Sequence, residues 1–358
     1  MKHKLRNALV RFAGELLSDK RKPTLVIDIR QNGRFHYPLI FSFIQCFNVE
    51  LTNRSLGQIL SVIFQFRLFG KVNFYKGKET KYKYFLSDDF DSDLAQLDWK
   101  KRIYLSSDWY KTAGDEEYKM PYYFHPNFYS DGLFSMIDPP NRVKTRSHKL
   151  FFAGTYNKEA YDELPDYFGM LKRYTIISSI QQSFSHKISL NKMTGHSATI
   201  LFHLTSDRSN SLQKFQLSQQ EVFQFLSNSD YALCPPGCFQ PPSHNLVEAL
   251  SQGAIPLCNY GHLLPVPLED GRNSLLFKTI DDLISKVEFI LNAPYSRTKE
   301  LRNEAIEYYD RHVSPGSFAN DFSRRIDTVS TLILNNETFS VNLIDDLANN
   351  RSSQPSSS

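Results

Sequence analysis

The sequence lacks any run of about 18 consecutive apolar residues, the length that a membrane-spanning helix needs. Cysteine is also scarce, with only Cys46, Cys234, Cys238 and Cys258. The Cys234–Cys238 spacing has no second Cys or His pair nearby, as a structural zinc site would require. We therefore expect reduced, partly buried thiols and a cytoplasmic location.

Several motifs of common enzyme classes are missing as well. The sequence has no G-x-x-x-x-G-K-[ST] phosphate loop and no G-x-G-x-x-G fingerprint. It also has no G-x-S-x-G nucleophile elbow and no H-E-x-x-H zinc pair. Asp89-Phe90-Asp91 has the Asp-x-Asp spacing of a metal loop, but it follows a Tyr-rich stretch and is interpreted as a surface turn. No bound metal is expected.

The sequence also lacks a large excess of either charge. It has 42 Lys and Arg residues and 38 Asp and Glu residues, which gives a net charge of +4. That balance gives no indication of nucleic-acid binding. The exception is residues 1–22, where basic residues outnumber acidic ones and the apolar residues fall on one helical stripe. Two interpretations stay open: a helix packed on its own domain, or a helix on the anionic inner face of a membrane.

Strand and helix patterns alternate along most of the chain. The first series has predicted strands at 24–29, within 71–85 and at 102–106, and predicted helices at 37–47 and 55–69. The second has predicted strands at 150–153, 198–204, 231–234 and 254–257, and predicted helices at 173–184, 218–227, 243–252, 281–291 and 298–309. A last helix is expected at 317–334. This alternation predicts an α/β protein with mostly parallel, doubly wound sheets.

A domain boundary is predicted in the proline-rich stretch that includes residues 121–126 and 138–141. Proline restricts itself and the residue before it, so no regular element should run through this stretch. The predicted organisation is an N-terminal domain at 1–135, a C-terminal domain at 136–316, closing helices at 317–348 and a disordered polar tail at 349–358.

The stretch from 229 to 277 carries the strongest functional signal. Pro235-Pro236-Gly237 stops a strand and lets the backbone approach a ligand, and Ser243 suits the N-cap of the next helix. Ligands of open parallel sheets bind beyond the carboxyl ends of the strands, where a helix N-terminus attracts a diphosphate. Glu248, about a turn and a half further on, suits a ribose diol. The alternative, a solvated helix residue, stays open.

This stretch resembles the C-terminal domain of exostosin-like glycosyltransferases, which are two-domain GT-B enzymes. The similar segments are Leu150-Phe151-Phe152-Ala153-Gly154, Cys234-Pro235-Pro236-Gly237, Ser243 to Ala249, Gly253-Ala254-Ile255-Pro256-Leu257 and Leu264 to Glu269. Their order and approximate spacing agree over about residues 149–277. The family's Arg in the donor helix is Asn245 here, and Arg173 or Arg208 is a candidate source of the missing charge. The N-terminal half shows no match, and GT-B fucosyltransferases and 3-deoxy-octulosonate transferases are alternative relatives.

The resemblance implies two Rossmann-like domains with parallel sheets facing across a cleft. It also implies transfer of a sugar from a nucleotide-sugar donor, bound by 136–316, to a hydroxyl of a glycan or glycolipid acceptor, bound by 1–135. No cofactor is implied, because the helix dipole and basic side chains neutralise the leaving diphosphate. The predicted donor-binding residues are Glu248, Ser243, His244, Asn245, Gly154, Arg173 and Gly237.

An inverting transfer needs a base that deprotonates the acceptor hydroxyl. Asp108 and His36 are the predicted catalytic residues because each follows a predicted strand, and Glu116 and Glu117 are further candidates. Two other functions stay open. One is a sugar- or nucleotide-binding protein without catalysis, which Asn245 favours, and the other is a membrane-surface scaffold that uses residues 1–22.

Overall fold

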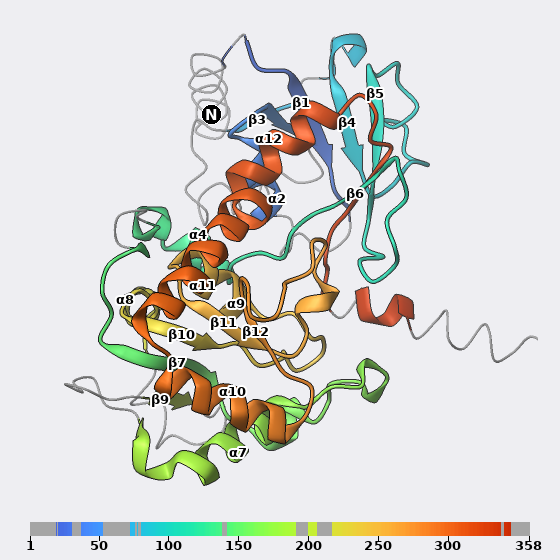
Figure 1. Cartoon of the computed structure of the whole chain (residues 1–358). Helices are drawn as coiled ribbons and strands as arrows, with labels where there is room; N and C mark the ends of the chain where they lie inside the picture. Colours follow the sequence, from blue (N-terminus) through green and yellow to red (C-terminus); the bar gives the residue numbers. More distant parts are fainter. Residues whose placement is uncertain are drawn as a thin grey trace, which may run out of the picture. The chain divides into compact units, whose positions relative to one another are not determined.

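The computed structural model describes residues 19, 21–30, 37–52, 72–75, 77, 80–137, 142–190, 200–205, 217–337 and 340–344. The chain forms two compact units. Unit 1 comprises residues 1–121, 126–132 and 315–358, and unit 2 comprises residues 122–125 and 133–314 (Figure 1). The chain therefore returns to unit 1 after residue 314. Helix 55–69, residues 1–18 of the basic N-terminus and the tail 349–358 were predicted from sequence but lie outside the described residues.

Unit 1 is built on a seven-stranded sheet in the order β3-β2-β1-β4-β5-β13-β6, and every pairing in it is parallel. The strands are β1 (Thr24–Asp28), β2 (Asn48–Leu51), β3 (Val72–Phe74), β4 (Tyr84–Ser87), β5 (Lys101–Ser106), β6 (Glu117–Lys119) and β13 (Thr331–Ile333). From β1, the chain first adds β2 and β3 on one side and then β4 and β5 on the other. The topological switch point therefore lies between the carboxyl ends of β1 and β4.

Aromatic side chains join the two ends of the chain within unit 1. Its helices within the described residues are α2 (Tyr37–Phe43), α4 (Pro126–Ser130) and α12 (Pro315–Arg325). The ring of Phe43 in α2 lies with its centroid 5.5 Å from that of Phe318 and 4.9 Å from that of Phe322, both in α12. All three rings are buried, so their burial holds α12 against α2.

The predicted closing helices at 317–348 are partly wrong. The helix ends at Arg325, and residues 331–333 form β13, which lies between β5 and β6 in the sheet. Leu332 and Ile333 are fully buried there. The apolar residues near 330 also fit helical spacing. The extended form is favoured because a strand at this place pairs its backbone groups with both β5 and β6, which come from elsewhere in the chain.

Unit 2 is built on a six-stranded sheet in the order β12-β11-β10-β7-β9-β8, again with every pairing parallel. The strands are β7 (His148–Thr155), β8 (Ile188–Leu190), β9 (Ile200–Thr205), β10 (Ser229–Leu233), β11 (Ile255–Cys258) and β12 (Leu275–Leu276). β8 and β9 lie on one side of β7, and β10, β11 and β12 lie on the other. The switch point of this sheet therefore lies between β7 and β10.

Helices cover both faces of this sheet. They are α6 (Lys158–Tyr161), α7 (Arg173–Phe184), α8 (Gln219–Ser227), α9 (His244–Ser251), α10 (Ile280–Asn292) and α11 (Tyr295–Tyr308). Figure 1 shows α7 and α10 on one face and α9 and α11 on the other. The predicted fold class, two α/β domains with parallel sheets, is confirmed by these strand pairings. None of the helices in the described residues is long and apolar enough to cross a membrane.

A buried ion pair connects β10 to α11. The guanidinium of Arg302, 1% exposed, pairs with the carboxylate of Asp230, 6% exposed, and Lys149 lies 3.3 Å from the same carboxylate.

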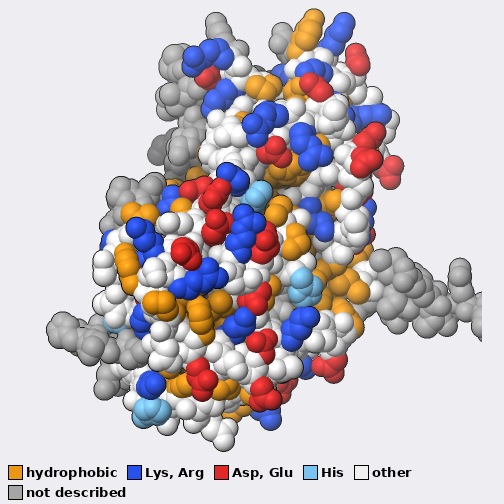
Figure 2. All heavy atoms as spheres, viewed as in Figure 1, with side chains coloured by type: hydrophobic (Ala, Val, Ile, Leu, Met, Phe, Trp, Pro, Cys, Tyr) orange, Lys and Arg blue, Asp and Glu red, His pale blue; other side chains and the backbone are white. Residues whose placement is uncertain are grey.

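On the surface, basic and acidic side chains are interspersed over the face of unit 2 seen in Figure 2.

We predict that Asp230→Ala lowers the free energy of unfolding by about 3 to 5 kcal/mol, because it leaves the Arg302 cation buried without its partner. Glu300→Ala is the matched control. Glu300 pairs with Arg297 at 3.0 Å, but both side chains are largely exposed, so its removal should cost less than about 1 kcal/mol. Urea unfolding measures both, and equal losses would contradict the prediction.

Candidate functional site

The predicted donor residues converge on the switch point of unit 2. Gly154 lies near the end of β7, Pro235-Pro236-Gly237 follows β10, and Ser243 precedes α9. Because β7 and β10 are parallel neighbours, their carboxyl ends and the loops after them lie at one edge of the sheet. This is the edge at which open α/β sheets bind ligands.

Ser243 occupies the N-cap position of α9, with φ −129° and ψ 151°, but its side chain does not cap the helix. Its hydroxyl donates instead to the carbonyl of Pro235 at 3.0 Å and lies 3.0 Å from the hydroxyl of Tyr260. The expectation of a capping side chain is therefore wrong. Ser243 instead connects the start of α9 to the loop after β10, and its hydroxyl accepts no hydrogen bond from the N–H groups of the first helical turn.

Arg173, the first residue of α7, places a buried positive charge at the same edge. Only 5% of the residue is exposed. Its Nε donates to the carbonyl of Pro236 at 2.9 Å, and its Nη1 donates to the hydroxyl of Tyr161 at 2.7 Å. Among the described residues no carboxylate pairs with this guanidinium. Since buried cations are normally paired with an anion, this charge is available to an anionic ligand.

Two glycines keep backbone close to this charge. A Cβ at Gly237 would lie 2.7 Å from the backbone carbonyl oxygen of Gln240, so any side chain would force the loop to shift. A Cβ at Gly154 would lie 3.0 Å from Cζ of Phe152 and 3.5 Å from Nη1 of Arg173. The loops after β7 and β10 are therefore shaped around glycine.

Asn245 and His244 fix the start of α9 to two other segments. Nδ2 of Asn245 donates to the carbonyl of Ala153 at 3.0 Å, which ties the helix to the end of β7. Nδ1 of His244 lies 2.9 Å from the carbonyl oxygen of Tyr123. A carbonyl oxygen only accepts, so this contact requires the proton on Nδ1. The structure therefore brings both residues to the predicted site.

The segment 122–125 was missed as part of the site. The ring of Tyr122 stacks on His244 with centroids 5.3 Å apart, and its hydroxyl accepts from Nε2 of Gln240 at 3.2 Å. The ring of His125 meets that of His244 edge-on at 5.2 Å. In the sequence this segment shows only prolines and aromatics. No local pattern indicates that it docks against a helix more than a hundred residues later.

Glu248 is buried, 4% exposed, so the alternative of a solvated helix residue is excluded. Its Oε1 accepts from Nε2 of Gln219, at the start of α8, at 2.7 Å. Burial raises the pKa of the Glu248 carboxyl, while nearby His244, the Gln219 amide and the backbone N–H of His125 act to lower it. An acid kept in the interior with no Lys or Arg partner among the described residues, close to a switch point, is a functional candidate.

The predicted bases lie in unit 1. Asp108 follows β5, is half-buried, and its backbone N–H donates to the hydroxyl of Ser106 at 3.1 Å. Glu117 pairs with Lys111 at 2.7 Å, and this contact together with the Gly114 N–H lowers the pKa of the Glu117 carboxyl, which makes it a weaker base. Glu116 is exposed. His36 lies outside the described residues.

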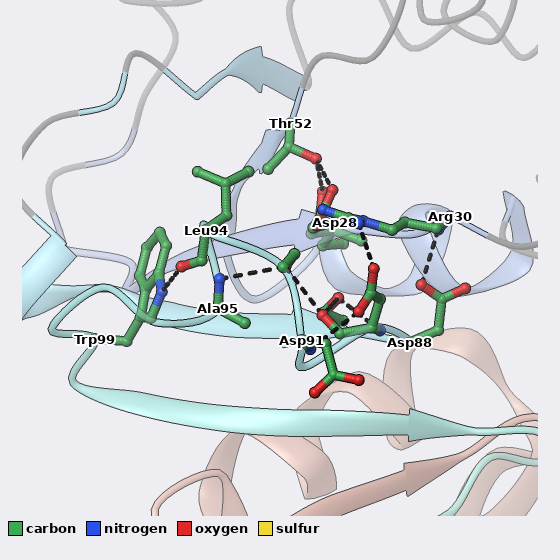
Figure 3. Close-up of polar contacts among 12 residues, drawn as sticks. Asp28, Arg30, Thr52, Asp88, Asp91, Leu94, Ala95 and Trp99 are labelled. Atoms are coloured by element: carbon green, nitrogen blue, oxygen red, sulfur yellow. Dashed lines mark hydrogen bonds and ion pairs between the residues drawn. The ribbon is translucent and has the colours of Figure 1, made fainter.

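A polar cluster at the switch point of unit 1 was also missed (Figure 3). Asp28 ends β1 with 1% exposure and accepts hydrogen bonds from Thr52 and Arg30. The backbone N–H of Arg30 donates to Asp88 at 2.8 Å, and its guanidinium pairs with Asp89 in the predicted turn. The only sequence signal is an acid directly after a buried apolar run. The described residues contain no group of three or more His, Cys, Asp or Glu side chains that could hold a metal ion.

Comparison with known proteins gives likeness of fold only. No family model matches the sequence, so the resemblance to exostosin-like enzymes stays a prediction, and no curated protein matches it either. Anabaena HepE, solved with UDP and glucose, is similar at TM-score 0.46 and 9% identity over 86% of this chain and 100% of HepE. A glycosyltransferase from Rickettsia africae is similar at TM-score 0.47 and 7% identity, over 85% of this chain and 98% of that protein. The lipopolysaccharide outer core galactosyltransferase WaaB is similar at TM-score 0.41 and 11% identity, over 84% of this chain and 99% of WaaB. At these scores the likeness identifies no activity.

We predict that Glu248→Gln makes the ligand-free protein more stable than the wild type at pH 8 but not at pH 4. The raised pKa of Glu248 means that its contribution to stability is present below the ordinary carboxyl pKa and is lost as the pH rises through the raised value. Glutamine does not titrate.

Glu221→Gln is the control with the opposite sign. Hydrogen bonds from Ser218 lower the pKa of the Glu221 carboxyl, so the wild type should gain stability relative to this variant as the pH rises. Urea unfolding between pH 4 and 8 measures both differences. A difference for Glu248→Gln that does not change with pH would contradict the prediction.

Proposed function

We propose that this protein is a nucleotide-sugar-dependent glycosyltransferase of the GT-B type, related to the exostosin-like family. It would transfer a sugar to a hydroxyl of a glycan or glycolipid. The observation that carries the proposal is the buried guanidinium of Arg173, which has no carboxylate partner among the described residues and lies at the switch point of unit 2. A positive charge in that position suits the diphosphate of a nucleotide sugar.

The start of α9 supports the same conclusion. The hydroxyl of Ser243 leaves the first-turn N–H groups to other partners, and a helix N-terminus favours negative charge. Asn245, where the exostosin-like family has Arg, is held by Ala153 and carries no charge. We infer that Arg173 supplies the missing charge and that it and α9 together stabilise the leaving diphosphate, without a metal ion.

Glu248 gives the site an acceptor of opposite sign. Among the described residues, its buried carboxylate accepts hydrogen bonds from two neutral donors, the Gln219 amide and the His125 N–H. We infer that it accepts the hydroxyls of the donor's ribose, the role that a carboxylate commonly has in nucleotide sites. His244 and Gly237 then shape the site, the first by its bond to Tyr123 and the second by letting the loop turn tightly.

Unit 1 would supply the acceptor site and the base. Asp108 lies at the carboxyl edge of its sheet, directly after β5, and Glu117 is occupied by Lys111. We therefore propose that Asp108 is the base that removes the proton of the acceptor hydroxyl. Peripheral contact with the inner face of a membrane through residues 1–22, from a cytoplasmic location, is part of the proposal and suits a glycolipid acceptor.

Arg173→Ala should weaken nucleotide binding by about 10- to 100-fold, the loss expected for a charged hydrogen bond. A thermal-shift screen with UDP, GDP and CMP first identifies the nucleotide, and calorimetry then measures its affinity. Arg297→Ala, an exposed arginine bonded to the Gly271 carbonyl, is the control and should bind as the wild type does.

The double variant Arg173→Ala/Asn245→Arg should recover part of the lost affinity, because it returns a positive charge to the start of α9. Unchanged nucleotide affinity in Arg173→Ala would remove the central support for the proposal.

Asp108→Asn should lower the rate of sugar transfer by about 10²- to 10⁴-fold, the usual contribution of a general base, with nucleotide affinity unchanged. Glu116→Gln, an exposed acid of the same unit, should leave both quantities as in the wild type. The measurements are nucleotide release with acceptor present and calorimetric binding. Full transfer activity in Asp108→Asn would show that the base is another residue.

A further inference from the structure

Asn259, directly after β11, has a buried carbonyl oxygen without a hydrogen-bond partner among the described residues. The residue is 8% exposed, and its Nδ2 donates to the carbonyl of Leu171 at 2.9 Å. Because the Leu171 carbonyl only accepts, the amide cannot exchange its two ends without losing this bond. Oδ1 is therefore held as an acceptor that nothing in the described part of the chain uses.

An acceptor in this state is unusual. Most buried polar atoms in proteins have a partner, and an unpaired one costs free energy because its hydration is lost and not replaced. A donor from outside the chain, an N–H or an O–H group, would remove that cost. The residue thus has the property expected of a ligand contact.

The position of Asn259 relates it to the proposed donor site. β11 pairs with β10, so Asn259 and the Pro235-Pro236-Gly237 loop follow neighbouring strands at one edge of the sheet. Tyr260, the next residue, contacts the hydroxyl of Ser243, and Leu171 lies two residues before Arg173. Asn259 is therefore connected to both elements that carry the positive charge of the site.

The order of groups along this edge indicates which part of a ligand Asn259 would meet. Glu248 bonds to Gln219 at the start of α8, which follows β9, on one side of the switch point. Arg173 and the start of α9 lie at the switch point, between β7 and β10. Asn259 follows β11, on the other side. A ligand bound by the first two through its ribose and its diphosphate would extend its sugar toward Asn259.

We propose that Oδ1 of Asn259 accepts a hydrogen bond from a hydroxyl of the transferred sugar and so helps to select the donor. This inference rests on the proposed function. A rigid acceptor whose partner is missing rejects a sugar that lacks the corresponding hydroxyl, because the acceptor then stays buried and unpaired. A neutral amide suits this role, since a hydroxyl is a neutral donor.

The test compares nucleotides with their sugar conjugates: UDP with UDP-glucose, GDP with GDP-mannose, and deoxy analogues of the conjugate that binds. In Asn259→Ala, affinity for the conjugate should fall by about tenfold, and affinity for the nucleotide alone should not change. The wild type should discriminate against one deoxy analogue, and Asn259→Ala should not. Asn273→Ala is the control: this amide is also buried, but its Oδ1 already accepts from the Glu269 N–H at 2.8 Å.

The outcomes separate this inference from the proposed function. Three results for Asn259→Ala would overturn this inference while leaving a nucleotide site in place. Its affinity could fall equally for the nucleotide and the conjugate, it could fall for neither, or the variant could still discriminate against the same deoxy analogue. A crystal structure of the donor complex in which only a water molecule donates to Oδ1 would also overturn it. A wild type that binds no nucleotide or nucleotide sugar would overturn both proposals.

Discussion

A buried guanidinium that has no carboxylate partner in the described part of the chain is the constraint on which the site depends. Arg173 joins α7 to the loop after β10 through Pro236 and to α6 through Tyr161. Leaving such a charge unpaired in a protein interior is costly, and a bound anion removes much of that cost. Because Ser243 does not cap α9, the helix N-terminus adds its own partial positive charge near the same loop. The local structure thus favours a ligand that carries negative charge.

Glu248 carries the complementary charge in the same unit, and no ion pair forms between it and Arg173. Its carboxylate instead receives hydrogen bonds from neutral donors on α8 and on segment 122–125. Two buried groups of opposite sign, kept apart, give a ligand with phosphates and hydroxyls separate contacts at each end. Ligands with that composition include nucleotide sugars, which is why these two residues together favour the proposed donor over a simple anion.

The two sheets use their switch points differently. In unit 1, the guanidinium of Arg30 pairs with the carboxylates of Asp28 and Asp89, and its backbone N–H donates to Asp88 (Figure 3). In unit 2, the Arg173 guanidinium at the corresponding place bonds to Pro236 and Tyr161 and has no carboxylate partner among the described residues. The Arg30 cation is therefore already paired with carboxylates of its own sheet edge, whereas the Arg173 cation favours an anionic ligand. This contrast favours unit 2 over unit 1 as the place where the proposed donor binds its diphosphate.

Local patterns in the sequence determined a large part of this protein. Periodicity gave the bounds of α7 at 173–184, and turn residues together with an apolar stripe located the loop, the N-cap position and Glu248, since each depends on near neighbours in the chain. Only the tertiary structure decided that Arg173 reaches Pro236, that segment 122–125 packs on α9, and that β13 fills the space between β5 and β6. Those contacts join residues far apart in sequence, where no period or spacing records which partner will be near.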